Sequence, residues 1–267
     1  MKIYGISDMH MDYEQNRNLI LGLKDMSLKD DVILVAGDIS NNISILLETL
    51  GFLRSLSRAV FFVPGNHDIW INGDFPDSLA KFNHIIRWCR KNSIDVAPRV
   101  IDGILFAPLY SWYSSSFTDE KDIDMPRSWA DLHRCKWPGT SQESLEQVFD
   151  RMNIVLENPA NLPVVSLSHF LPRPELLPAR QFLRFKELGA VSGSRLLGKR
   201  VKEIKSKVHV FGHTHINGEF VIDGTIFIQN SLKYPHEQIG NRANLLRRIR
   251  IPQMSGSQNL KKIRQIQ

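Results

Sequence analysis

A short apolar run that ends in a polar loop recurs five times along the chain. These runs are rich in Val, Ile and Phe, have the length of a strand and lack a regular alternation of polar residues. Continuous apolar runs of this kind are typical of strands that are buried on both faces. We therefore predict buried strands at residues 2–7, 31–37, 59–65, 162–168 and 207–212.

Apolar residues at three- to four-residue spacing predict helices between these strands. We expect helices over residues 43–56, 77–89 and 140–156, and one that begins after Ser194. Asp77 and Ser194 are suited to cap two of these helices, and TSQE at 140–143 has the form of a capping box. Near the end, Asp223-Gly224 predicts the turn of a hairpin. Alternating strands and helices, followed by a late hairpin, indicate a layered α/β protein.

The composition is typical of a soluble globular protein. The chain has 267 residues, of which 42% are hydrophobic and 23% are charged. No apolar run approaches the ~20 residues that a membrane span needs, and the start MKIYGISD lacks the architecture of a signal peptide. The 2 cysteines, Cys89 and Cys135, have no paired spacing, so we expect no disulfide framework. These features favour a cytoplasmic protein.

The net charge of +6 is concentrated at the C-terminus. Residues 241–267 contain seven Lys and Arg and no Asp or Glu, so the first 240 residues carry a net charge of −1. We therefore expect a domain over residues 1–240 and a basic tail over 241–267. A basic tail could bind nucleic acid, anionic lipid or an acidic partner, or act only as a solubilising end.

Each predicted strand ends in side chains that can bind a metal ion. Ligands tend to bind beyond the carboxyl ends of strands in sheets of this type. The donors are carboxylates, imidazoles and an amide without thiolate, which favours Mn, Fe or Zn over a soft thiolate site. Six or more donors exceed the need of one four-coordinate zinc, so we predict two divalent metal ions that share a carboxylate. The residues are Asp8, His10, Asp38, Asn66, His67, His169, His213 and His215.

The motifs DMH, AGD, PGNHD, SHF and GHTH, in this order between residues 8 and 215, resemble those of the calcineurin-like metallophosphoesterases. The resemblance implies an α/β fold, a four-layer αββα sandwich in which helices flank two mixed β-sheets. It places a dinuclear metal site at the strand ends and makes residues 1–240 the catalytic domain.

The resemblance also implies a role for each motif residue. Asp38 bridges the two metals, and the remaining ligands divide between them. His67 is the active-site histidine that binds no metal, and Asp68 joins it as a candidate catalytic residue that supports the loop or orients a neighbour. The first metal is held by Asp8, His10 and His215, and the second by Asn66, His169 and His213.

These roles imply hydrolysis of a phosphoester. Two cations lower the pKa of a bridging water and supply a hydroxide, while His67 acts as general acid toward the departing oxygen. The sequences GDISNN and GNHD depart from the GDxVDRG and GNHE of the family's protein Ser/Thr phosphatases. We therefore expect a phosphodiester or phosphomonoester that is a small molecule or a nucleotide.

Two other functions remain open at this stage. The chain could be a nuclease or nucleic-acid-processing phosphodiesterase that uses the tail 241–267 to bind its substrate. It could also be a non-catalytic scaffold of the same fold, although every ligand position and His67 are intact. Deletion of the tail separates the nuclease from the small-molecule enzyme.

Two irregular segments could form walls of the site. Residues 110–137 are an aromatic insertion that could close as a lid or stack a base, or pack as a hydrophobic cluster. Residues 171–182 contain three prolines, which indicates a stiff loop. The aromatic candidates are Trp112, Tyr113, Phe117, Trp129 and Trp137, and the phosphate-binding candidates are Arg127, His133, Arg134, Arg173 and Arg180.

Overall fold

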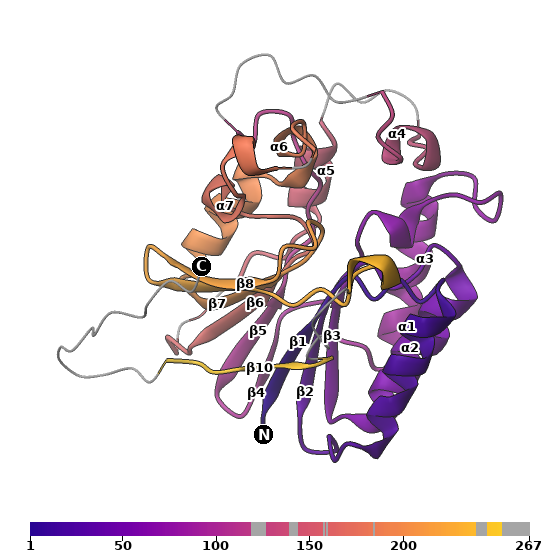
Figure 1. The fold of residues 1–267 in the computed structure, drawn as a ribbon. Helices are drawn as coiled ribbons and strands as arrows, with labels where there is room; N and C mark the ends of the chain where they lie inside the picture. The colour runs from indigo at the N-terminus through magenta and orange to yellow at the C-terminus, as the bar shows by residue number, and fades with distance from the viewer. Residues whose placement is uncertain are drawn as a thin grey trace.

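Two mixed β-sheets pack face to face, and helices cover the outer face of each sheet (Figure 1). The computed structural model describes residues 1–118, 127–138, 144–156, 158, 160–183, 185–238 and 245–252. This architecture confirms the predicted four-layer α/β sandwich.

The first sheet has the strand order β10-β1-β2-β3. Its strands β1, β2 and β3 are parallel to one another, whereas β10 runs antiparallel to β1. The bounds are β1 Ile3–Ile6, β2 Val32–Ala36, β3 Ala59–Val63 and β10 Arg247–Ile249.

The second sheet has the strand order β4-β5-β6-β7-β9-β8. Four of its strands are parallel, and β4 and β8 run antiparallel at its two edges. The bounds are β4 Arg99–Ile101, β5 Ile104–Pro108, β6 Val164–Leu167, β7 Ser206–Phe211, β8 Gly218–Ile222 and β9 Thr225–Gln229.

Apart from the short helix α4, the α-helices fall into two groups (Figure 1). The first group, α1 to α3, covers the outer face of the first sheet, and α5 to α7 lie on the other side of the molecule. Their bounds are α1 Glu14–Leu21, α2 Ile43–Leu56, α3 Ser78–Lys91, α4 Asp131–Arg134, α5 Leu145–Arg151, α6 Gly189–Ser192 and α7 Arg195–Glu203. Short 3-10 helices are η1 Gly22–Asp25, η2 His67–Ile69, η3 Pro174–Leu176, η4 Arg180–Phe182 and η5 Pro235–Glu237. No helix in these described ranges is long and apolar enough to cross a membrane.

Most of the predicted elements form where the residue pattern placed them. All five apolar runs contain a strand, and α2 spans the predicted residues 43–56. The Asp77 carboxylate accepts a hydrogen bond from the backbone N–H of Ala80, and the Ser194 hydroxyl accepts one from Leu197. These caps begin α3 and α7 as expected. The turn at Asp223 and Gly224 has positive φ at both residues, which matches a tight hairpin turn.

The helix predicted over 140–156 is shorter in the described residues. It begins at Leu145 because Ser144 and Gln147 form the capping box, and the predicted box TSQE lies outside the described residues. It ends at Arg151, and two residues later the side chain of Asn153 bonds to the backbone of Tyr110. The Asn153 amide accepts from the N–H of Tyr110 at 2.7 Å and donates to its carbonyl at 2.8 Å.

Part of the predicted tail belongs to the folded domain. Residues 247–249 form β10, in which Ile249 pairs with Ile3 and is only 4% exposed. The Arg247 guanidinium also lies 2.7 Å from Glu219 at the edge of the second sheet. The boundary expected near residue 240 therefore does not separate this segment from the sheet, because the backbone of β1 binds it as an edge strand.

The core lies between the two sheets and extends into the aromatic insertion. The rings of Phe61 on β3 and Phe106 on β5 stack at 4.7 Å across the interface. Trp112, Tyr113 and Phe117 are at most 6% exposed, and Trp112 packs against the rings of its neighbours. These three rings form part of a hydrophobic cluster and are not free to stack a base in this conformation.

Candidate metal centre

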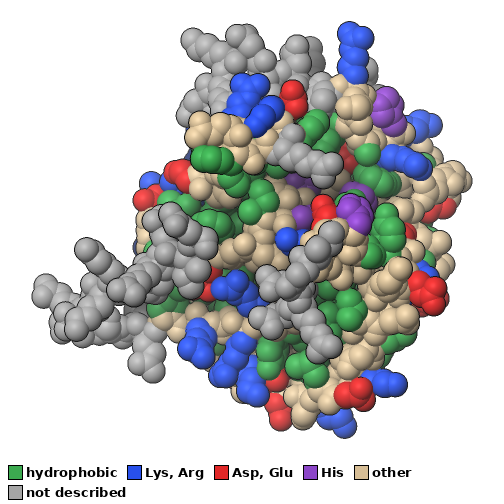
Figure 2. All heavy atoms as spheres, viewed as in Figure 1, with side chains coloured by type: hydrophobic (Ala, Val, Ile, Leu, Met, Phe, Trp, Pro, Cys, Tyr) green, Lys and Arg blue, Asp and Glu red, His purple; other side chains and the backbone are tan. Residues whose placement is uncertain are grey.

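The ends of β1, β2, β3, β6 and β7 bring the predicted ligands together at one edge of both sheets. Their side chains are buried or nearly so, although they come from five segments that are far apart in the sequence. Figure 2 shows histidine side chains gathered near the middle of this face, at a hollow bordered by hydrophobic side chains. The structure therefore places all seven predicted metal ligands in one cluster.

Asp8, His10 and His215 form one half of the cluster. Their nearest donor atoms all lie within 4.8 Å of one another. The two imidazoles face each other through their Nε2 atoms at 3.0 Å, and His215 Nε2 lies 3.5 Å from Asp8 Oδ1. A carboxylate and two imidazole nitrogens that converge in this way can hold one metal ion.

Asn66, His169 and His213 form the other half. The Asn66 Oδ1 atom lies 3.0 Å from His169 Nε2 and 3.2 Å from His213 Nδ1. Asp38 lies between the halves, with Oδ2 3.4 Å from His169 Nε2. Donor atoms of Asp38 and Asp8 also approach within 4.8 Å. This central position is the one that a bridging carboxylate needs.

Three histidines are held with one nitrogen facing the cluster and the other bonded away from it. His169 Nδ1 donates to the carbonyl of Ala36 at 2.9 Å, and His213 Nε2 donates to the carbonyl of Val191 at 2.8 Å. His215 Nδ1 lies 2.6 Å from Glu237 Oε2. Such remote hydrogen bonds fix the tautomer and leave the other nitrogen with a lone pair for a metal.

The charges of the cluster fit a cation. Burial raises the pKa of Asp38, and the neighbouring carboxylates of Asp8 and Asp68 raise it further. Burial by itself lowers the pKa of His215, but hydrogen bonds to Asp8 and Glu237 outweigh it and raise the pKa to about 9, so a proton competes with a metal ion for Nε2 of this imidazole. Repulsion among buried carboxylates is relieved by positive charge between them. A divalent ion bound by these residues supplies that charge, so the donor set fits a metal.

The backbone at the ligands is strained. Five of the seven have positive φ, a region that residues other than glycine rarely adopt. Each such residue costs about 1 kcal/mol or more, and strain of this kind clusters at functional sites. The angles are 49° at Asp8, 42° at His10, 57° at Asp38, 76° at His213 and 56° at His215.

Glycine precedes three of the ligands because the loops touch. A Cβ atom on Gly65 would lie 2.2 Å from Asp38 Oδ1, and one on Gly212 would lie 2.8 Å from Asp8 Oδ2. Only a residue without a side chain permits these approaches. The glycines of the motifs therefore let two ligand loops pack against each other.

Asp68 supports a loop and does not face the donors of the cluster. It is fully buried, and its two carboxylate oxygens accept from the backbone N–H groups of Asp38, Ile39, Ser40 and Gly65 at 2.8–3.1 Å. These bonds join the loop after β2 to the loop after β3. The geometry agrees with both roles considered for Asp68, because the same bonds support the loops and position Asp38.

His67 lies at the open side of the cluster. Its ring stacks on Trp70 at 3.6 Å, and its Nε2 lies 3.9 Å from Asp38 Oδ2 and 3.4 Å from the hydroxyl of Tyr234. Burial lowers the pKa of His67, and the neighbouring histidines lower it further. The side chain is 15% exposed, so it can reach a bound substrate. A neutral imidazole here can donate one hydrogen bond.

Four residues of the site lie outside the sequence motifs. Glu237 orients His215, and Tyr234 stacks on His10 at 4.1 Å. Asp131 accepts hydrogen bonds from Asn66 Nδ2 at 2.9 Å and from the indole of Trp70 at 2.6 Å. No local signal identifies them, apart from the position of Trp70 directly after the PGNHD motif.

Two of the five expected phosphate-binding residues, Arg173 and His133, are engaged elsewhere. Arg173 pairs with Glu175 at 2.5 Å and with Asp223 at 2.7 Å, beside the hairpin turn. His133 bonds to the carbonyl of Arg127, and the Arg134 guanidinium lies 6.0 Å above the ring of Trp70. Arg134 therefore approaches the residues around His67.

Comparison with known proteins agrees with this geometry. The family model of the calcineurin-like phosphoesterases matches residues 1–217. The acyl-carrier-protein phosphodiesterase PptH of Mycobacterium tuberculosis is 23% identical over an alignment of 259 residues that covers 88% of this chain and 78% of the relative. The crystal structure of the phosphopantetheinyl hydrolase PptH from the same organism aligns with a TM-score of 0.75 at 18% identity, over 96% of this chain and 98% of that one. The chain belongs to the calcineurin-like phosphoesterase family and is a hydrolase of phosphoester bonds.

Proposed function

We propose that the protein is a dinuclear metal-dependent phosphodiesterase that removes a phosphopantetheinyl group from a carrier protein. The orientation of His169, His213 and His215, each with its remote nitrogen bonded away from the cluster, is the observation that carries the metal-dependent part. The choice of a diester and of this substrate is supported by the relative named for that activity, which aligns over 88% of the chain.

The donors divide naturally between two ions. Asp8, His10 and His215 would hold one, and Asn66 with the two other histidines would hold the second, while Asp38 serves both. When bound, such ions supply a hydroxide at neutral pH and neutralise charge on the phosphate. The oxygen and nitrogen donors favour Mn, Fe or Zn.

His67 would protonate the leaving oxygen. In the hydrolysis, an oxygen from water forms a bond to phosphorus, the bond from phosphorus to the carrier-protein oxygen breaks, and that oxygen takes a proton. Stacking on Trp70 holds the ring of His67 in place, and its backbone N–H donates to Asp38 Oδ1 at 2.9 Å. A negative phosphate nearby raises the affinity of the imidazole for the proton that it transfers.

The nuclease and scaffold alternatives receive less support. Neither the curated relative nor the solved structure described above, both of which are named PptH, is named for a nucleic-acid substrate. All seven donors and His67 converge, which a scaffold does not require. A phosphodiester substrate linked to a protein therefore accounts for more of the observations.

The decisive experiment compares three substrates on protein that is stripped of metal and refilled with Mn. These are a carrier protein that bears phosphopantetheine, bis-p-nitrophenyl phosphate and p-nitrophenyl phosphate, with His67→Ala and a control His84→Ala on α3. We expect release of phosphopantetheine, a preference for the diester, normal metal content in both variants and loss of turnover only in His67→Ala. Turnover of the small diester without release of phosphopantetheine from the carrier protein would reject the proposed substrate. Full activity of His67→Ala would reject the role of His67 as general acid.

A further inference from the structure

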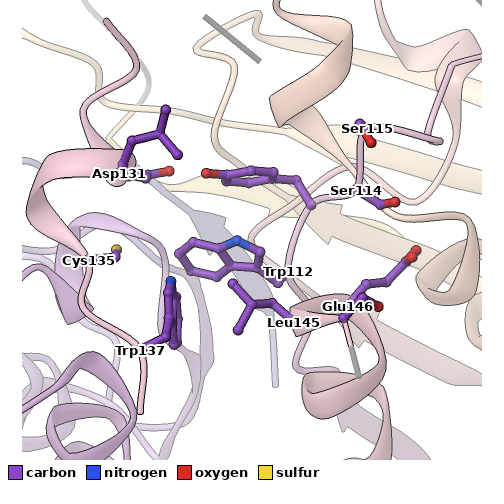
Figure 3. A pocket seen from close by; sticks show the side chains of 11 residues that line it. Trp112, Ser114, Ser115, Asp131, Cys135, Trp137, Leu145 and Glu146 are labelled. Atoms are coloured by element: carbon purple, nitrogen blue, oxygen red, sulfur yellow. The ribbon is translucent and has the colours of Figure 1, made fainter. Parts of the chain in front are cut away.

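A pocket with an aromatic floor adjoins the metal centre. It has a volume of about 360 Å³, and Figure 3 shows Trp112 and Trp137 within it, between Asp131 and Cys135 on one side and Ser114, Ser115 and Glu146 on the other. A volume of this size lies within the ~300–1,000 Å³ that small-molecule pockets occupy. The pocket can therefore hold a chain-like molecule but no folded partner.

Two of its walls are shared with the metal centre. Asp131 lines the pocket and accepts from Asn66 Nδ2 at 2.9 Å, so only one hydrogen bond separates it from a ligand of the cluster. The ring of Tyr113 lines the pocket and lies 6.5 Å from the ring of His213, with an angle of 23° between the planes. Asp131 and Tyr113 therefore form the boundary at which the metal centre and the pocket adjoin.

The floor is held in place by packing. Trp112 is 3% exposed, and its ring meets Trp137 edge-on at 4.9 Å and stacks on Phe149 at 5.7 Å. Phe170, next to the ligand His169, contacts the rings of Trp112 at 5.2 Å and Tyr113 at 5.4 Å. Because buried rings in mutual contact lose little freedom on binding, the pocket is formed before a ligand arrives.

The lining selects a neutral ligand. No Lys or Arg is among the described residues that line the pocket, whereas serines and the carboxylates of Asp131 and Glu146 are. This chemistry disfavours a second phosphate or a nucleotide, since buried phosphates need cationic or backbone N–H partners. Aromatic rings and serine hydroxyls suit a neutral chain that alternates methyl or methylene groups with amides and a hydroxyl.

We propose that this pocket binds the pantetheine arm of the substrate while the phosphate lies at the metal centre. The proposal rests on the proposed function. A pantetheine arm is neutral, carries two amides and a hydroxyl, and leads directly away from the phosphate. Bound in this way, the arm holds the phosphorus at the cluster and leaves the carrier protein outside, as the departing group.

The test narrows the pocket at its exposed rim. Ser115 is exposed and lines the pocket, so Ser115→Phe fills space without disturbing the floor. Ser55→Phe on the exposed side of α2 is the matched control. We expect Ser115→Phe to raise KM for the phosphopantetheinyl carrier protein about tenfold, with less than about a twofold change for bis-p-nitrophenyl phosphate. An unchanged KM for the carrier protein would overturn the proposal.

A binding measurement separates this proposal from the proposed function. Pantetheine is titrated against the metal-free protein while tryptophan fluorescence is followed, with Trp112→Phe to assign the signal. Saturable quenching that Ser115→Phe abolishes and Ser55→Phe retains supports the pocket, even if carrier protein is not hydrolysed. A flat titration of the wild type up to the solubility limit of pantetheine overturns the proposal, even if carrier protein is hydrolysed.

Discussion

Asp131 is a carboxylate of the site that lies outside the set of seven predicted metal ligands. Its Oδ1 atom accepts from Asn66 and Trp70, and its Oδ2 accepts from the indole of Trp129 at 2.9 Å. It therefore decides that Asn66 presents oxygen, and not nitrogen, toward His169 and His213. Through Trp70 it also holds the ring that stacks on His67.

Asp131→Ala should lower metal occupancy and turnover together. Partners of this kind typically contribute about 10–100-fold to metal affinity or activity, and the amide of Asn66 can rotate without its acceptor. Metal content after gel filtration and the rate on bis-p-nitrophenyl phosphate measure the two effects. Asp150→Ala, which removes a carboxylate that pairs with Arg200 on the surface, is the control. Wild-type metal content in Asp131→Ala would show that Asn66 is held by other contacts.

His209 on β7 should make the protein less stable in mild acid. It is fully buried between the hydroxyls of Ser166 and Ser168, at 2.7 and 2.9 Å, and burial lowers its pKa to about 3. The unfolded chain has a histidine pKa of about 6.5, so it binds more protons between these values. The contribution of neutral His209 to the free energy of unfolding is therefore complete above about pH 6.5. It is lost as the pH falls toward 3.

The size of this effect can be isolated with His209→Gln. Linkage predicts that the wild type loses about 2 kcal/mol more unfolding free energy between pH 7 and pH 5 than a variant that does not titrate there. Urea unfolding of both proteins at the two pH values, in the presence of a chelator, gives the difference. Equal losses in the two proteins would mean that His209 is protonated, or exposed, in the folded state.

At the scale of the element, each motif depends on how closely two strand ends approach. Gly65 follows β3, and a Cβ atom there would lie 2.2 Å from Asp38 Oδ1 and 2.8 Å from its backbone nitrogen. Gly65→Ala should therefore displace Asp38 and reduce metal binding, as measured by calorimetric titration with Mn. Gly51→Ala in α2 is the control, because its Cβ would meet only Trp88 at 3.9 Å. Equal metal affinity in both variants would exclude close packing as the reason for glycine.

At the scale of the whole molecule, the C-terminal segment has two parts. Residues 247–249 complete the first sheet as β10, and residues beyond 252 carry Lys261, Lys262 and Arg264. Deletion of 253–267 should leave turnover of a diester unchanged, because the sheet and the cluster stay intact. Deletion of 241–267 removes β10 and should lower the melting temperature.

The nuclease alternative makes the opposite prediction for the shorter deletion. Loss of three positive charges would weaken phosphate contacts and lower activity on single-stranded DNA or RNA, most clearly at low salt. A large loss on nucleic acid, with measurable wild-type activity, would favour that alternative over the carrier protein.

The sequence by itself determined seven of the ten described strands, four of the seven described α-helices and the seven donors that gather in the cluster, whereas β4, β5 and β10 were not predicted. These features depend on local pattern: apolar runs, three- to four-residue spacing, caps such as Asp77, and motifs at strand ends. Since parallel strands end at a common edge, the motifs also indicated that the donors meet.

Only the tertiary structure decided which other residues complete the site. Asp131 meets Asn66 across 65 positions of the chain, and Glu237 meets His215 across 22. The three-residue strand β10 has too little length for a pattern and forms because β1 offers it a free edge. Contacts of this kind depend on how distant segments pack, so no local spacing in the sequence records them.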